Sequence, residues 1–147
     1  MSYQLRKAEK FGPGLRRLCR KQIEAAIAVA TGEKKTSDTP VHEMRKHIKK
    51  GRAALRLVRK EIGAGLFREQ DDCLRDVGRL TSEIRDAEVR LQTVRELQGI
   101  TRHRRRRGAY PKLEVMLIME LENFMAAFAE WQTQVVPVLE RAAIVCN

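Results

Sequence analysis

The chain has 147 residues, a length that fits one domain, and 43% of them are hydrophobic while 33% are charged. This composition excludes a disordered chain, and a mean hydropathy of −0.45 without a long apolar run excludes a membrane span. Thirty basic side chains outnumber nineteen acidic ones, so the net charge of +11 favours a polyanionic partner over a neutral metabolite. Only seven side chains are aromatic, too few for a base-stacking surface.

Three cysteines lie far apart along the chain, at Cys19, Cys73 and Cys146. Their odd number and wide spacing are typical of reduced thiols, which indicates a cytoplasmic protein. No signal-peptide core is visible near Met1. We therefore expect a cytoplasmic location.

Apolar residues recur at helical spacing throughout, which predicts an all-α protein. The first helix is predicted from about Gly14 to Ala30, and the polar run Glu33 to Asp38 is predicted as a loop. The second helix should begin with Thr39 as N-cap and Pro40 at its first position, where the missing N–H of proline costs nothing. It is predicted to end near Ile62, before a Gly-Ala-Gly sequence.

Three further helical segments follow in chain order. They are predicted over about Leu66 to Leu80, Ile84 to Gln98 and Pro111 to Val145, with a kink at Pro137. The Arg-rich segment of residues 101–109 is predicted as a loop, because adjacent like charges repel one another. The last helix carries one continuous apolar seam of the kind that bundles bury: Leu117, Leu121, Phe124, Phe128, Trp131, Val135 and Val138.

Basic side chains are concentrated in the first part of the chain. Residues 1–60 hold 17 basic and 5 acidic side chains, whereas residues 110–147 hold 2 and 5. Six residues of the second predicted helix repeat at steps of three and four, within an arc of about 100° and over about 26 Å. We call this row the basic stripe: His42, Arg45, Lys49, Arg52, Arg56 and Arg59.

Two interpretations of the basic stripe are open. A row of cations is often only a solvated helix face. However, Arg45 to Lys60 contains eight cations and no acid, and such repulsion costs helix stability. An anionic ligand explains the pattern better, with arginine forks holding phosphate oxygens and Lys49 acting as a point charge.

Four further arginines are candidate contacts for the ligand. They form two pairs that each span one helical turn: Arg75 with Arg79, and Arg16 with Arg20. Asp72 and Asp76 are expected to form ordinary ion pairs with Arg75, Arg79 or neighbouring lysines. Asp86 is expected to cap the helix that resumes after Leu80.

Catalysis and metal binding are not predicted. His42 either packs or caps the helix, or donates to a phosphate oxygen from the head of the basic stripe. His47 faces elsewhere and His103 lies in the Arg-rich segment, so the histidines do not form a metal site. The sequence shows no nucleophile–base pair and no phosphate-cradling glycine loop. We expect neither enzymatic activity nor a cofactor.

The basic stripe and two later segments resemble the CHAD family, the conserved histidine α-helical domains. The first motif reads V-H-x-x-R-x-x-x-K-x-x-R-x-x-L-R-x-x-R from Val41 to Arg59, and Leu74-Arg75 and the run Arg85 to Val89 follow it. Gly51 stands where the family usually has a bulky apolar residue, which weakens the helix and opens space, and Glu88 replaces a usual aspartate. The histidine motif occurs once, whereas family members usually contain two helical halves.

The resemblance implies a fold and a function. The expected fold is an antiparallel helical bundle, one half of the usual two-bundle architecture, forming a single domain over residues 1–147. The basic stripe would line a groove that binds inorganic polyphosphate, and polyphosphate granules would then be a candidate site of association in the cytoplasm. An uncovered seam on the last helix, from Leu117 to Val138, predicts a homodimer in place of the family's two halves.

Other functions are kept as alternatives. The first is non-specific nucleic-acid binding through the Arg102 to Arg107 run, and the second is a helical module that meets an acidic protein. A polyphosphate-cleaving enzyme ranks last, because the best carboxylate cluster, around Asp71, lies on an ordinary helix. We expect no membrane partner.

Overall fold

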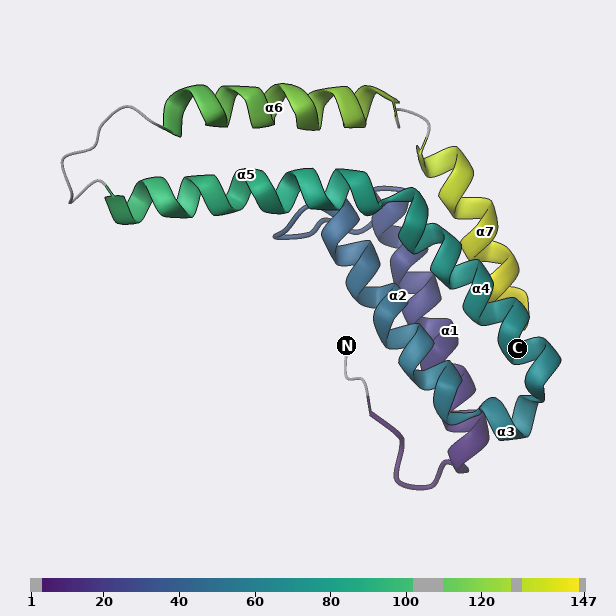
Figure 1. The fold of residues 1–147 in the computed structure, drawn as a ribbon. Coiled ribbons are helices and arrows are strands. Elements are labelled where there is room, and N and C mark those ends of the chain that lie inside the picture. Colours follow the sequence, from purple (N-terminus) through teal and green to yellow (C-terminus); the bar gives the residue numbers. More distant parts are fainter. Residues whose placement is uncertain (1–3, 102–109, 128–130, 146–147) are drawn as a thin grey trace. The chain divides into compact units, whose positions relative to one another are not determined.

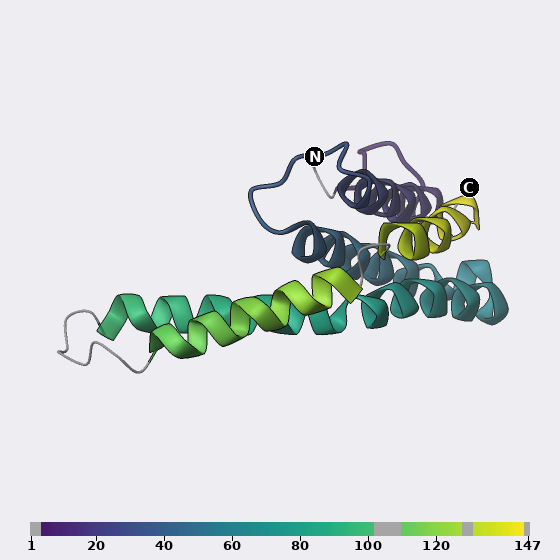
Figure 2. The ribbon, with the colours of Figure 1, turned by 90° about the horizontal axis from the view of Figure 1, so that it is seen from above.

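The computed structural model describes residues 4–101, 110–127 and 131–145. Within those ranges it contains seven helices and no strand, so the prediction of an all-α protein is confirmed. The chain divides into two compact units, one made of residues 1–80 and 131–147 and the other of residues 81–130 (Figures 1 and 2). Each described helix is too short or too polar to span a bilayer.

The first unit contains five helices: α1 (Phe11–Ala30), α2 (Pro40–Leu57), α3 (Arg59–Ile62), α4 (Ala64–Leu80) and α7 (Trp131–Val145). α1 packs against α2 and α7, and α4 packs against the same two helices (Figure 1). The four long helices therefore form a closed ring around an apolar core. The core residues include Ile23, Met44, Leu74, Val77, Val135 and Leu139.

The start of α2 follows its local sequence. The Thr39 hydroxyl accepts a hydrogen bond from the backbone N–H of His42 at 3.4 Å, and Pro40 is the first helical residue. The predicted end near Ile62 is wrong by one turn. α2 ends at Leu57, Val58 turns its side chain into the core, and α3 adds one separate turn before Gly63. Gly63 has a φ of 85°, a conformation that favours glycine and stops the helix.

α1 and α2 run antiparallel at close range. Cys19 of α1 donates through its thiol to the carbonyl oxygen of Gly51 at 3.5 Å, and His47 of α2 lies 2.9 Å from the amide oxygen of Gln22. Gly51 is buried and faces α1 closely. Neither Cys19 nor Cys73 forms a disulfide, and Cys146 lies outside the described residues.

The second unit is a pair of antiparallel helices, α5 (Ser82–Thr101) and α6 (Tyr110–Ala127). Ion pairs join them, from Arg95 to Glu114 at 2.9 Å and from Arg90 to Glu120 at 3.0 Å. α5 begins at Ser82, so Asp86 lies in its second turn and is exposed, and the prediction that Asp86 caps this helix is wrong.

The predicted last helix, from Pro111 to Val145, is two helices in the structure. α6 packs against α5 in the second unit, whereas α7 packs against α1 and α4 in the first. The apolar seam is therefore divided between two cores. Its described members are buried or half-buried within the chain, so the expectation of an uncovered seam from Leu117 to Val138 is wrong. Pro137 lies inside α7 and is exposed. Residues 128–130, between the two helices, and most of the Arg-rich segment, 102–109, lie outside the described ranges.

Candidate functional site

A hollow of about 80 Å³ lies between α2 and α4 in the first unit. α2 and α4 are antiparallel, with Arg45 opposite Gly78 and Arg52 opposite Asp71. Three cations of the basic stripe reach the wall of the hollow, and the rest of the wall is apolar or glycine. The lining residues are Arg45, Ile48, Lys49, Arg52, Leu74 and Gly78.

Two of the three cations are held by α4. Nη1 of Arg45 donates to the carbonyl oxygen of Gly78. Nε and Nη2 of Arg52 donate to the two carboxylate oxygens of Asp71, each at 2.8 Å. These bonds fix both guanidinium groups beside the hollow, because a forked arginine–carboxylate pair restrains the whole plane of the side chain.

The neighbouring arginines keep the carboxyl group of Asp71 in its charged form. The Arg52 guanidinium holds the pKa of Asp71 below its usual range, and the charges of Arg52, Arg56 and Arg75 act in the same direction, while desolvation opposes them. The same pair raises the pKa of Arg52. Both side chains are therefore ionised at neutral pH.

The other cations of the basic stripe differ in their exposure and in the helix that carries them. Lys49 and Arg56 are exposed on α2. Arg59 is not on α2 as predicted, because the helix ends at Leu57 and Arg59 begins α3. Its guanidinium lies over the ring of Phe67, 5.1 Å from the centroid. Five of the six stripe residues thus share one helix.

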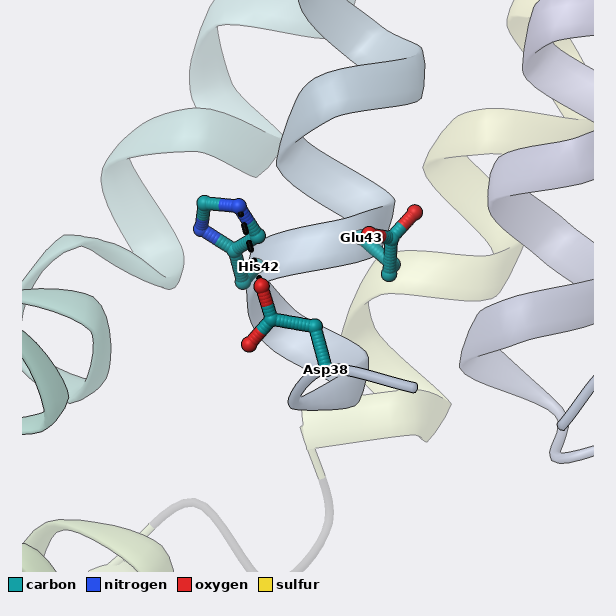
Figure 3. Close-up of side chains that lie close together, drawn as sticks. All are labelled: Asp38, His42 and Glu43. Atoms are coloured by element: carbon teal, nitrogen blue, oxygen red, sulfur yellow. Dashed lines mark ion pairs between the residues drawn. The ribbon is translucent and has the colours of Figure 1, made fainter. Parts of the chain in front are cut away.

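His42 lies at the head of α2 in a cluster with two carboxylates (Figure 3). Nε2 of His42 is 3.3 Å from a carboxylate oxygen of Asp38. One ligand atom each of Asp38, His42 and Glu43 lies within 4.8 Å of the others, so these residues could hold a metal ion. Lys46 donates to Glu43 at 2.6 Å and lowers the pKa of that carboxyl, so a cation would have to displace an ammonium group there.

The predicted second row of arginines is paired with its neighbours. Arg75 lies 2.8 Å from Asp72, and Arg79 lies 3.7 Å from Asp76. Both ion pairs confirm the expectation for these two acids. The rows on α2 and α4 are close in space through the Arg52–Asp71 pair.

Arg16 and Arg20 of α1 lie apart from the lining of the hollow between α2 and α4. Arg20 lies 3.6 Å from Glu24. Arg16 lines a different small pocket, together with Cys19 and Gln70. The structure thus does not bring this predicted pair to the hollow.

Asp71, Leu74 and Gly78 belong to the site, but sequence reasoning did not assign them to it. They follow one another at steps of three and four residues on α4, the face that also buries Val77. An acid on the core-facing side of one helix, opposite a row of cations, was the signal that could have identified Asp71. Recognising this signal requires knowing that α2 packs against α4, and the sequence does not show which helices pack together.

The fold and site define a class: an all-α protein whose histidine-headed basic helix borders a hollow. The family model of the CHAD domain matches residues 16–142, which is most of the chain, and the protein belongs to the CHAD domain family. Comparison with curated proteins and with solved structures gave no match.

Proposed function

We propose that the protein binds inorganic polyphosphate at the hollow between α2 and α4. The observation that carries the proposal is the convergence of Arg45, Lys49 and Arg52 on one hollow in a CHAD domain. Phosphate oxygens suit this set, because guanidinium groups and ammonium groups donate hydrogen bonds and accept none.

The wider surface of α2 supports a long ligand over a single phosphate. His42 and Arg56 lie on the same face as the three cations at the hollow and extend the basic stripe to about 21 Å within α2. A linear polyanion can contact several turns at once, whereas one phosphate can contact only one or two cations. The length of the basic stripe thus supports a phosphate chain over a single phosphate.

The test is to replace the four central cations of the basic stripe by glutamine: Arg45, Lys49, Arg52 and Arg56. We expect affinity for long polyphosphate to fall by about a hundredfold or more, since several charge-assisted hydrogen bonds are lost together. Isothermal titration measures the affinity, and circular dichroism checks that helical content is retained.

A control removes three charges outside the basic stripe, two on α2 and one on α3. Glutamine at Lys46, Lys50 and Lys60 should weaken binding much less. If this control loses as much affinity as the stripe variant, binding follows net charge alone and the proposed site is wrong.

Non-specific nucleic-acid binding is the competing function. Long polyphosphate and DNA of matched charge, compared at physiological salt, separate the two. We expect polyphosphate to bind more tightly, because the residues that line the hollow include three cations and no aromatic side chain on which a base could stack. Equal affinity would favour the nucleic-acid function.

We also propose that two copies of the chain associate through α6. Leu117, Leu121 and Phe124 lie on the side of α6 that carries Glu114, which pairs with α5, and they are half-buried. The opposite side is also apolar, and Val115, Met116 and Met119 are 57%, 66% and 58% exposed. Both sides of α6 therefore carry large apolar residues, and the side away from α5 also needs cover.

A second copy suits this face by charge as well. Lys112 and Glu122 lie on the exposed side of α6, five residues before and after Leu117. Suppose that two α6 helices pair antiparallel and that the two copies cross at the level of Leu117. Lys112 of each copy then lies beside Glu122 of the other, and Val115 lies beside Met119 of the other. Light scattering should then give about 34 kDa, twice the 16.9 kDa of one chain.

A further inference from the structure

We propose that Asp71 is a positioning residue that holds Arg52 ready for phosphate and so strengthens polyphosphate binding, although it is itself an anion beside the site. The inference rests on the proposed function of the hollow. It assigns a role to an acidic residue that simple charge counting would treat as unfavourable.

The geometry of the pair carries the first step. The carboxylate of Asp71 accepts one hydrogen bond from Nε and one from Nη2 of Arg52, at 2.8 Å each. A guanidinium has five N–H donors, so three stay available to a second anion. Arg52 lines the hollow, whereas Asp71 is not among its described lining residues. The carboxylate thus holds Arg52 without filling the hollow.

Burial makes the pair rigid. The side chains of Arg52 and Asp71 are 25% and 16% exposed, and Asp71 lies between buried Gln70 and the core residue Leu74 on α4. An unrestrained arginine loses rotamer freedom when it binds a ligand. Because Asp71 orders Arg52 in the unliganded protein, the rotamer freedom of Arg52 is already lost before phosphate binds.

Two other roles for Asp71 predict the opposite sign. If Asp71 occupied the place of phosphate on Arg52, ligand would have to displace it, and removing the carboxylate would tighten binding. If only long-range charge mattered, removing one negative charge would also tighten binding. The direction of the change therefore separates positioning from both alternatives.

The experiment compares Asp71→Asn with Asp76→Asn by isothermal titration with long-chain polyphosphate. Both variants lose one negative charge from α4, but Asp76 pairs with Arg79 in an exposed ion pair away from the lining of the hollow. We expect Asp71→Asn to bind about fivefold more weakly, the effect of leaving one long side chain to be ordered on binding. Asp76→Asn should bind equally or slightly more tightly.

A double-mutant cycle tests whether the effect acts through Arg52. In an Arg52→Gln background, Asp71→Asn should no longer weaken binding, since no guanidinium is left to position. If the substitution still weakens binding fivefold there, Asp71 acts through the structure in general and the inference is overturned. Tighter binding by Asp71→Asn alone overturns it as well.

A second variant covers the case in which Asp71→Asn does not fold. Arg52→Lys keeps the charge but cannot be held by both carboxylate oxygens as a planar fork, so binding should weaken by a similar factor. Unchanged affinity would overturn the positioning role. Absence of polyphosphate binding by the wild-type protein would instead overturn the proposed function itself.

Discussion

His47 is a histidine whose surroundings favour its neutral form. Its Nδ1 lies 2.9 Å from the amide oxygen of Gln22, and its Nε2 lies 3.4 Å from Nζ of Lys34. An ammonium group only donates, so Nε2 accepts and Nδ1 carries the proton that it donates to Gln22. Desolvation by burial, followed by the charges of Lys34 and Lys50, lowers the pKa of His47 below 6.5.

This pKa predicts a loss of stability in mild acid. The unfolded chain binds a proton at His47 near pH 6.5, whereas the folded chain resists it, so the unfolded state gains protons first. The free energy of unfolding should fall as the pH drops from 7.5 to 5.5. In His47→Gln that fall should be smaller, as measured by urea unfolding at both pH values. Equal falls in the two proteins would contradict the prediction.

Single-residue features were predictable where the partners are close in sequence. The Thr39 cap and the pairs of Arg75 with Asp72 and Arg79 with Asp76 all join residues three apart. The contacts of His47 with Gln22 and of Arg52 with Asp71 join residues 25 and 19 apart. They depend on which helices pair and in what register, and the sequence alone does not specify either.

At the scale of helices, periodicity located α2 but not its end. Apolar spacing continues from Val41 through Ile62, so a single helix was predicted. In the structure the backbone leaves the helix at Val58, whose side chain is 1% exposed. Core packing thus overrides helical periodicity at Val58. As a result, Arg59 lies on α3 and not on α2 with the rest of the basic stripe, and it contacts Phe67.

Gly51 lies on the side of α2 that packs against α1. The sequence suggested that Gly51 opens space, but the position is buried against α1. A Cβ atom there would lie 3.7 Å from Cβ of Gln22 and 3.9 Å from Cγ1 of Ile23, which is ordinary contact. Gly51→Ala should therefore raise the free energy of unfolding by about 1 kcal/mol through helix propensity, as measured by urea unfolding.

A larger side chain at the same position is the control. Gly51→Leu must enter the packed surface of α1 and should destabilise the protein by about 1–3 kcal/mol. If alanine destabilises the protein as well, α1 and α2 lie too close together at Gly51 for a Cβ atom to fit. If leucine is tolerated, the space at Gly51 is as open as the sequence suggested.

At the scale of the whole molecule, the division into two units was not predicted. The seam from Leu117 to Val138 has one continuous period, and nothing in that period marks where one core ends and another begins. The structure assigns Leu117 and Leu121 to the helix pair α5–α6, and Val135 to the core of the first unit. Composition and periodicity thus predicted the fold class, while the partner of each helix depended on three-dimensional packing.

Charging the exposed face of α6 should separate two copies of the chain. Replacing Val115 and Met119 by glutamate places like charges opposite each other in an α6–α6 pair, which opposes association. Light scattering should show the mass fall from about 34 kDa to the 16.9 kDa of a single chain. Leu57→Glu, which charges an apolar residue of α2 that is 62% exposed, is the control and should leave the mass unchanged.

Dissociation should also change binding in a way that depends on ligand length. A dimer carries two basic stripes, and a phosphate chain long enough to reach both gains from the high effective concentration of the second. The Val115→Glu, Met119→Glu variant should therefore lose affinity for long polyphosphate and keep its affinity for chains of a few phosphates. If its mass falls but affinity for long chains is unchanged, one basic stripe is sufficient for binding. If the wild-type protein is already a 16.9 kDa monomer at micromolar concentration, the exposed face of α6 does not serve a second copy.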